Sequence, residues 1–241
     1  MYLLFSGEGP TDMGQSTATA EVCEGTDFLP GPMAWFVDQW VERKAYLSHI
    51  ENGLCGFIPK PQLVARAKAS TSRKSMGLRG KKNHEYETRY YYNNARAMAQ
   101  IARERPEFSN DKVIVVLFRD GDGTQSAGRG EWRAKYQSMV DGFSREGADT
   151  GVPMIPRPKS EVWLLCAVAN NYQYCERLED ESGNDRSQNP LKDQLDQALG
   201  EGATRERLVE RIQNRKIDIE RIIDMPSLNR FKERLDDVLN A

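Results

Sequence analysis

The stretch VIVVLF, residues Val113–Phe118, is an uninterrupted apolar run rich in β-branched side chains, and DGDGT, residues Asp120–Thr124, follows it after one arginine. A run of this kind is typical of a strand that other elements cover on both faces, as in a parallel sheet. We therefore predict the central strand of an α/β domain here, with a polar turn at its carboxyl end.

Segments on both sides of this run continue the alternation of strand and helix. Strands are predicted over Tyr2–Ser6 and Val152–Pro156, and helices after Pro32, over 85–105, over 131–146 and over Val162–Ala169. Residues 13–31 show no sustained period, and we expect a loop there. The order predicts a Rossmann-like, mostly parallel sheet with helices on both faces.

The length of 241 residues fits one elaborated α/β domain with an appendage. We assign residues 1–183 to the domain and 184–241 to a C-terminal helical extension, joined by the polar stretch 184–190. Apolar residues after position 190 predict three or four short helices. These helices are expected to pack on the domain or to dock a partner.

Composition argues against several classes of protein. The 34 lysines and arginines nearly balance 36 acids, so no global field attracts the chain to polyanions. Four scattered cysteines and two histidines support a zinc site poorly, and we expect free thiols in a reducing compartment. No stretch approaches the roughly 18 apolar residues of a membrane span. A cytoplasmic protein without a membrane partner is the expectation.

Positive charge is concentrated in one segment. No acid lies between Glu51 and Glu85, and we expect a basic insertion over about 52–84. Its cations would bind nucleic-acid phosphates and make binding depend on salt, whereas the alternative is a solvated loop. The residues assigned to nucleic-acid binding are Arg73, Lys74, Arg79, Lys81 and Lys82.

Carboxylates follow three of the predicted strands. Glu8 lies in the turn Gly7–Asp12 after the first strand, Asp120 and Asp122 follow the central strand, and Glu161 follows the last. Because ligands bind outside the carboxyl ends of the strands in open α/β sheets, these acids are expected to meet. Mg²⁺ prefers such oxygen ligands, and Mn²⁺ is expected to substitute for it. Glu8 would act as the general acid or base, and Asp12 would hold a second ion or orient Glu8.

Each acid also has a simpler interpretation. The glycine-rich segment around Glu8 and the Asp120–Thr124 segment are both common turn sequences. Glu161 would stabilise a helix N-terminus, with Ser160 as the helix cap. The joint appearance of these acids at strand ends is what favours a metal site.

These motifs together resemble the Toprim fold of topoisomerases, bacterial primases and OLD-type nucleases. The further block PKSEVWLL, residues Pro158–Leu165, resembles RloB-like small Toprim proteins encoded beside ABC-type ATPases in phage-defence or restriction-associated loci. The resemblance implies a Mg²⁺-dependent nuclease acting on DNA or RNA, tRNA included, with an ABC- or SMC-type ATPase as partner. It implies Glu8 as general acid or base, and Asp120 and Asp122 as metal ligands. Glu161 is implied as a further metal ligand, and Asp12 matches the second acid of the OLD-type pattern, also at the metal. Lys159 matches no assigned position, but its charge would stabilise a transition-state phosphate.

Two other functions remain open from the sequence. Asp120–Thr124 also spells the nucleophile motif of haloacid-dehalogenase-like phosphatases, with Asp120 attacking a phosphomonoester and Lys159 as the downstream cation. Arg119 at the end of the buried strand and the unexplained Glu8 weigh against that scheme. The second alternative is a non-catalytic, Mg²⁺-binding partner subunit of an ATPase.

Overall fold

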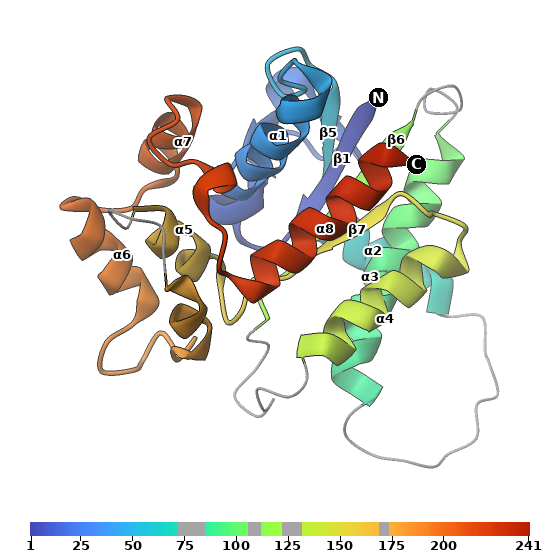
Figure 1. Cartoon of the computed structure of the whole chain (residues 1–241). Helices are drawn as coiled ribbons and strands as arrows, with labels where there is room; N and C mark the ends of the chain where they lie inside the picture. Colours follow the sequence, from blue (N-terminus) through green and yellow to red (C-terminus); the bar gives the residue numbers. More distant parts are fainter. Residues whose placement is uncertain (72–84, 106–111, 122–131, 169–173) are drawn as a thin grey trace.

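The computed structural model describes residues 1–71, 85–105, 112–121, 132–168 and 174–241 (Figure 1). Its main sheet has five strands in the order β3-β5-β1-β6-β7. β1, β5, β6 and β7 run parallel, and β3 pairs antiparallel with β5 at one edge. The strands are β1 (Tyr2–Gly7), β3 (Cys23–Glu24), β5 (Cys55–Ile58), β6 (Val113–Phe118) and β7 (Gly151–Met154).

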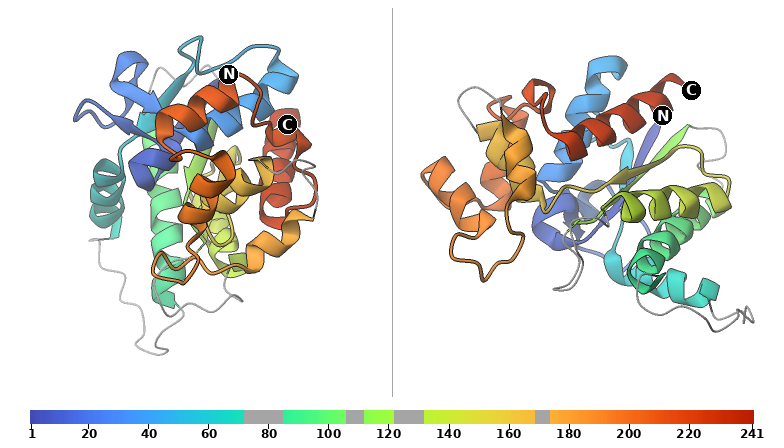
Figure 2. Two further views of the ribbon diagram at one scale, coloured as in Figure 1. Left: turned by 90° about the vertical axis from the view of Figure 1, so that its left-hand side faces the viewer. Right: turned by 60° about the horizontal axis from the view of Figure 1, so that its bottom comes forward.

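Helices cover both faces of this sheet, as the alternation of elements predicts (Figure 2). Leu3 and Phe5 of β1 pack into one apolar cluster with α1, α5, α7 and α8, whereas Leu4 packs into a second cluster with α2, α3 and α4. The helices are α1 (Pro32–Ala45), α2 (Lys60–Thr71), α3 (Glu85–Glu104), α4 (Trp132–Arg145), α5 (Ser160–Val168), α6 (Leu191–Leu199), α7 (Arg205–Gln213) and α8 (Pro226–Asn240).

Residues 13–31, which we expected to be a loop, contain short strands instead. β2 (Gly14–Ser16) and β4 (Phe28–Pro30) form a small antiparallel sheet, and β3 lies between them in the chain. Strands of two or three residues show no measurable period, so their pairing with distant segments is not visible in the sequence. Short helical turns complete the irregular part: η1 (Gly9–Met13), η2 (Gly25–Asp27), η5 (Cys175–Asp180) and η6 (Ile219–Arg221).

β5 is a strand that the sequence analysis did not predict. It lies inside the range 52–84, which we interpreted as an insertion, yet Phe57 pairs with Phe5 of β1 in the middle of the sheet. Its four residues include a glycine, which weakens any strand signal in the sequence. The first part of this range therefore belongs to the core, and α2 follows directly.

The C-terminal helices share the core of the α/β sheet. α8 packs on β7, and the Arg234 guanidinium donates hydrogen bonds to the carbonyls of Gly151 and Asp149. The Trp163 indole of α5 donates to the hydroxyl of Ser227 in α8 at 2.9 Å. Among the described residues, every helix is too short or too polar to span a lipid bilayer.

Candidate metal site at the carboxyl edge of the sheet

The chain changes direction at β1, and this change determines where the acids lie. After β1 the chain passes through α1 to β5 on one side of β1, and later returns to β6 on the other side. In open α/β sheets, a change of direction of this kind marks the usual place for a ligand, outside the carboxyl ends of the two strands, here β1 and β6. Glu8 follows β1 directly, and Asp120 lies two residues beyond the end of β6.

Glu8 is held at this edge by contacts with three described residues. Its Oε1 accepts the backbone N–H of Asp120 at 3.3 Å. Its Oε2 lies 3.3 Å from Nη1 of Arg119 and 3.4 Å from Nζ of Lys60. Gly9, the next residue, has a φ of +78°, a conformation that suits glycine far better than other residues. Thus Glu8 and Asp120 come together, as the strand-end argument predicts.

Arg119 is an unusual component of this edge. Its side chain is buried, its guanidinium lies 5.1 Å from the centroid of the Tyr90 ring, and its Nε and Nη2 have no hydrogen-bond partner among the described residues. A buried guanidinium is costly unless it is paired, so Glu8 is an important partner for it. The sequence signal was an arginine at the end of an otherwise apolar strand.

Ser160 links the remaining acids. Its backbone N–H donates to Oδ1 of Asp120 at 3.1 Å, and its hydroxyl donates to Oδ1 of Asp12 at 2.5 Å. The same hydroxyl lies 3.5 Å from Oε2 of Glu161. Sequence reasoning treated Ser160 only as a helix cap, because nothing local reveals that Asp12 lies opposite it.

Crowding and burial raise the pKa values of two acids in this site. Burial, together with the nearby Glu161 and Glu8 carboxylates, raises the pKa of Asp12 to about 6, against the hydrogen bonds from Ser160 and Thr11. Burial also raises the pKa of Asp120 well above its ordinary value, with Asp12, Glu161 and Glu8 adding to the effect. Like charges in a poorly solvated site disfavour ionisation, and a bound cation would reverse this.

The donor chemistry fits a hard divalent cation. Asp12, Asp120 and Glu161 form no ion pair with any described residue, and the nearby Lys159 is paired with Asp185 instead. Carboxylate oxygens are the ligands that Mg²⁺ prefers, and Mg²⁺ sites usually use only one or two of them. The residues present would therefore suit such an ion. Asp122 of the predicted pair lies outside the described residues.

The turn after β6 is supported from beneath. The Tyr91 hydroxyl donates to the Asp120 carbonyl at 2.9 Å, and the buried Lys135 ammonium donates to the Gly121 carbonyl at 2.8 Å. A Cβ at position 121 would lie 2.6 Å from the Pro156 carbonyl oxygen, so only glycine fits. Gly121 thus lets the connections after β6 and β7 approach each other.

Lys159 lies at the border of the site. Its ammonium donates to Oδ1 of Asp185 at 2.7 Å. Burial lowers the pKa of Lys159, but the charges of Asp185, Glu161 and Asp120 together raise it above the ordinary value. Its charge is therefore shared between the acids of the site and a partner from the polar stretch 184–190.

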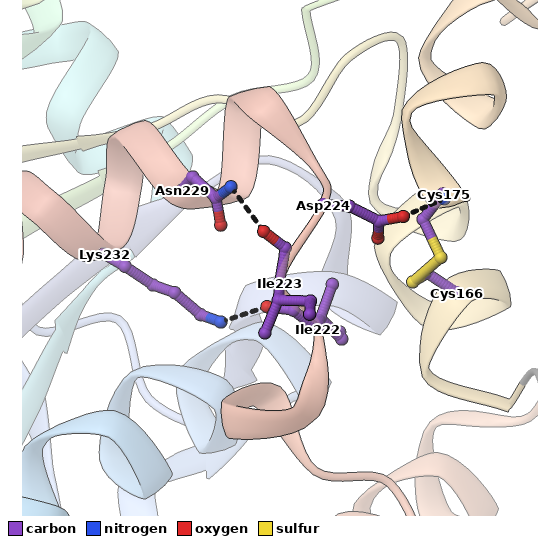
Figure 3. The surroundings of a disulfide bond; sticks show 7 residues. All are labelled: Cys166, Cys175, Ile222, Ile223, Asp224, Asn229 and Lys232. Carbon is purple, nitrogen blue, oxygen red and sulfur yellow. Dashed lines mark hydrogen bonds between the residues drawn. A yellow bond between two sulfur atoms is a disulfide. The ribbon is translucent and has the colours of Figure 1, made fainter. Parts of the chain in front are cut away.

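Two cysteines contradict the expectation of free thiols. Cys166 of α5 and Cys175 of η5 form a disulfide, and Asp224 accepts the backbone N–H of Cys175 beside it (Figure 3). Within the described ranges, these three residues are the one group of histidine, cysteine or acid ligand atoms that all lie within 4.8 Å of one another. Because both sulfurs are in the disulfide, we do not assign a metal to this group. The described carboxylates at the sheet edge do not meet this 4.8 Å criterion as a group of three. They are near neighbours, but they do not already form a complete set of metal ligands.

The basic residues assigned to nucleic-acid binding lie outside the described residues. They are Arg73, Lys74, Arg79, Lys81 and Lys82. Among the residues of the basic segment that the structure describes, Lys60 contacts Glu8 of the acidic site. Comparison of the chain with models of protein families, with curated proteins and with solved structures finds no match. What the protein does must therefore be argued from the site itself.

Proposed function

We propose that the chain is a metal-dependent nucleic-acid phosphodiesterase of the Toprim type, an effector of a phage-defence or restriction-associated system. The observation that carries the proposal is the meeting of Glu8, Asp12, Asp120 and Glu161 around Ser160 and the β6 turn. These acids come from three separate strand ends, so their meeting is not a consequence of proximity in sequence.

The roles follow from the contacts of each acid. Asp12 and Asp120, which form no ion pair with a described residue, would hold Mg²⁺ with Glu161, and Asp122 would add a further ligand. The ion would polarise a phosphodiester and lower the pKa of a bound water. Glu8 is oriented by Arg119 and Lys60, and it would transfer the proton at the attacking or leaving oxygen.

The phosphatase scheme accounts for fewer of these contacts. It requires Asp120 to attack phosphorus, yet Oδ1 of Asp120 accepts the Ser160 N–H and burial raises the pKa of Asp120. A nucleophilic carboxylate must be ionised, so a raised pKa opposes the role unless a cation binds. The scheme also gives Glu8 and Asp12 no function. An ATPase partner, as the resemblance implies, remains a separate proposal.

Cleavage assays with purified protein test the proposed function. Single-stranded DNA, duplex DNA and tRNA are incubated with Mg²⁺, Mn²⁺ or EDTA, and a phosphomonoester is assayed in parallel. We expect cation-dependent cleavage of a nucleic acid that Glu8→Gln and Asp120→Asn each reduce by at least a hundredfold. Asp237→Asn, an exposed acid on α8, is the matched control and should leave cleavage unchanged.

The alternatives predict different results in the same assays. Phosphomonoester hydrolysis that requires Asp120 but not Glu8 would support the phosphatase. Inactivity with every substrate, together with an ATPase complex that survives Glu8→Gln, would support the non-catalytic subunit.

A further inference from the structure

A pocket of about 670 Å³ opens between the first turns of α4 and α8 and the connection after β7. Its volume is within the range of small-molecule sites, roughly 300–1,000 Å³. Three arginines line it, namely Arg133 of α4, Arg157 after β7 and Arg230 of α8. Cations from three separate segments thus face one space.

The arginines differ in how far they are already engaged. Arg133 is exposed and makes no ion pair with a described residue. Arg230 pairs with the exposed Glu233 at 3.3 Å, a contact of the surface type that contributes little energy. Arg157 lies 3.3 Å from the exposed Asp180 and 3.9 Å from Glu179. Arg133 and Arg230 can therefore turn toward an anion without breaking a strong contact.

The pocket also has an aromatic wall. Trp132 and Tyr136 stack with their ring centroids 5.5 Å apart, and the indole N–H donates to the Ile155 carbonyl, which fixes the indole. Tyr136 is 6% exposed, and its hydroxyl has no hydrogen bond of ordinary geometry among the described residues, although the Arg230 guanidinium interacts with it and lies 5.2 Å from the ring centroid. A buried hydroxyl without a partner is uncommon, and a ligand in the pocket would supply one.

Two acids, Glu179 and Glu233, reduce the positive charge of the pocket. Glu179 is buried and accepts the backbone N–H of Ser227 at 2.6 Å, and burial raises its pKa. Glu179 therefore accepts a hydrogen bond at the N-terminus of α8. Its contact with Arg157, at 3.9 Å, is a weak one that a bound anion can replace. Glu233 is the competitor for Arg230 that an anionic ligand would have to displace.

The pocket and the acidic site share two chain connections. A Cβ at Gly121, the residue after Asp120, would lie 3.2 Å from Cδ1 of Trp132, so the aromatic wall adjoins the metal-site turn. Arg157 lies in the short connection between β7 and α5, three residues before Ser160, the first residue of α5. A ligand in the pocket would thus lie next to the segment that carries Asp120.

We propose that this pocket binds one nucleotide of a single-stranded nucleic acid, with Arg133, Arg157 and Arg230 on its phosphate and Trp132 against its base. Planar guanidinium groups suit phosphate oxygens, and aromatic side chains stack on bases of any sequence. The inference deepens the proposed function, on which it rests for the identity of the substrate.

Binding measured without catalysis tests the pocket by itself. Fluorescence anisotropy of a labelled single-stranded oligonucleotide is recorded in EDTA over a series of salt concentrations. We expect Arg133→Gln with Arg230→Gln to weaken binding at least tenfold and to lower the salt slope by about 0.7 per arginine. Glu233→Gln should strengthen binding about twofold or more, because it frees Arg230. Arg145→Gln, at the exposed far end of α4, is the control and should change nothing.

A second binding experiment tests whether the pocket recognises a base or only an anion. Trp132→Leu should weaken binding of the oligonucleotide but not of an abasic strand of the same length, with the thermal melt showing that the variant is folded. Wild-type affinity and slope in the arginine double variant would overturn the proposal, as would equal losses for both strands with Trp132→Leu. Because no cleavage is measured, failure of the nuclease proposal is seen separately, in the assays with Asp120→Asn.

Discussion

Arg119 shows how one residue connects the core to the candidate site. Its guanidinium is 0% exposed, whereas the Glu8 carboxylate that it contacts is partly exposed. The core fixes the arginine, and the arginine in turn fixes the carboxylate, so Arg119 acts as a positioning residue. The cost of burying its charge is the reason for its contact with Glu8.

Replacing Arg119 should therefore affect catalysis more than folding. We expect Arg119→Met to lower kcat ten- to a hundredfold with little change in KM, because Glu8 loses its orientation but substrate contacts remain. Arg119→Lys should recover part of kcat, which a purely structural role would not require. Steady-state kinetics of both variants check this, and an unchanged kcat in Arg119→Met would exclude the positioning role.

Lys232 is a second charged residue in an apolar setting. It donates to the Ile222 carbonyl at 2.5 Å and lies 4.6 Å from the Trp40 ring centroid, and burial lowers its pKa to about 8 (Figure 3). Since the pKa is lower in the folded chain than in the unfolded one, the charged form destabilises the fold. This cost is fully present below about pH 8 and fades as the pH rises toward 10.5.

Lys232→Met should remove that dependence on pH. We expect the free energy of unfolding of the variant to exceed that of the wild type most at pH 7. This difference should shrink as the pH rises and be nearly gone by pH 10. Urea denaturation of both proteins at several pH values measures the difference. A difference that is constant over this range would show that Lys232 keeps an ordinary pKa in the fold.

At the scale of elements, α5 connects the candidate site with the C-terminal region. Its first residue, Ser160, binds Asp120 and Asp12, and Cys166 near its other end is joined to η5 by the disulfide. The two cysteines are separated by 9 positions, so the bridge closes a short loop. By the chain-entropy model such a loop contributes about 2 to 3 kcal/mol.

Reduction of this disulfide should therefore lower stability without unfolding the sheet. We expect a reductant to lower the thermal midpoint of the wild type by several degrees, and Cys166→Ala with Cys175→Ala to melt at the lower temperature with or without it. Thiol labelling after denaturation in the absence of reductant should detect Cys23 and Cys55 alone. Labelling of all the cysteines would contradict the bridge.

At the scale of the whole molecule, the C-terminal helices and the sheet form one core. Leu235 and Phe231 of α8 are buried in the cluster that contains Phe5 of β1 and Val116 of β6. Burial of α8 on the sheet means that residues 184–241 contribute to the stability of the strands that carry the acids. Such a molecule should unfold in a single cooperative transition.

Leu235→Ala tests this continuity. We expect a loss of about 2 to 4 kcal/mol in the free energy of unfolding, since the residue is fully buried and leaves a cavity. Ile223→Ala, at an exposed position in the same region, should cost far less. Circular dichroism and tryptophan fluorescence should give coincident transitions for both variants. A transition in which only part of the signal shifts would indicate an independent C-terminal unit.

The sequence by itself determined the features that depend on local pattern. The apolar run Val113–Phe118, the first strand and the helices after Pro32 and over 85–104 follow from periodicity and turn residues, because these act over a few neighbouring positions. The acids after each strand could be assigned to one edge, since parallel strands share the direction of their carboxyl ends.

Only the tertiary structure decided the features that depend on distant partners. β5 and β3 are strands because of the neighbours with which they pair. The Ser160 hydroxyl donates a hydrogen bond to Asp12, which is 148 positions away in the sequence. The disulfide, the Arg119–Glu8 contact and the arginine pocket likewise join segments whose sequences contain no sign of one another. Folding brings these side chains together through burial of the shared core, and that driving force has no local signature.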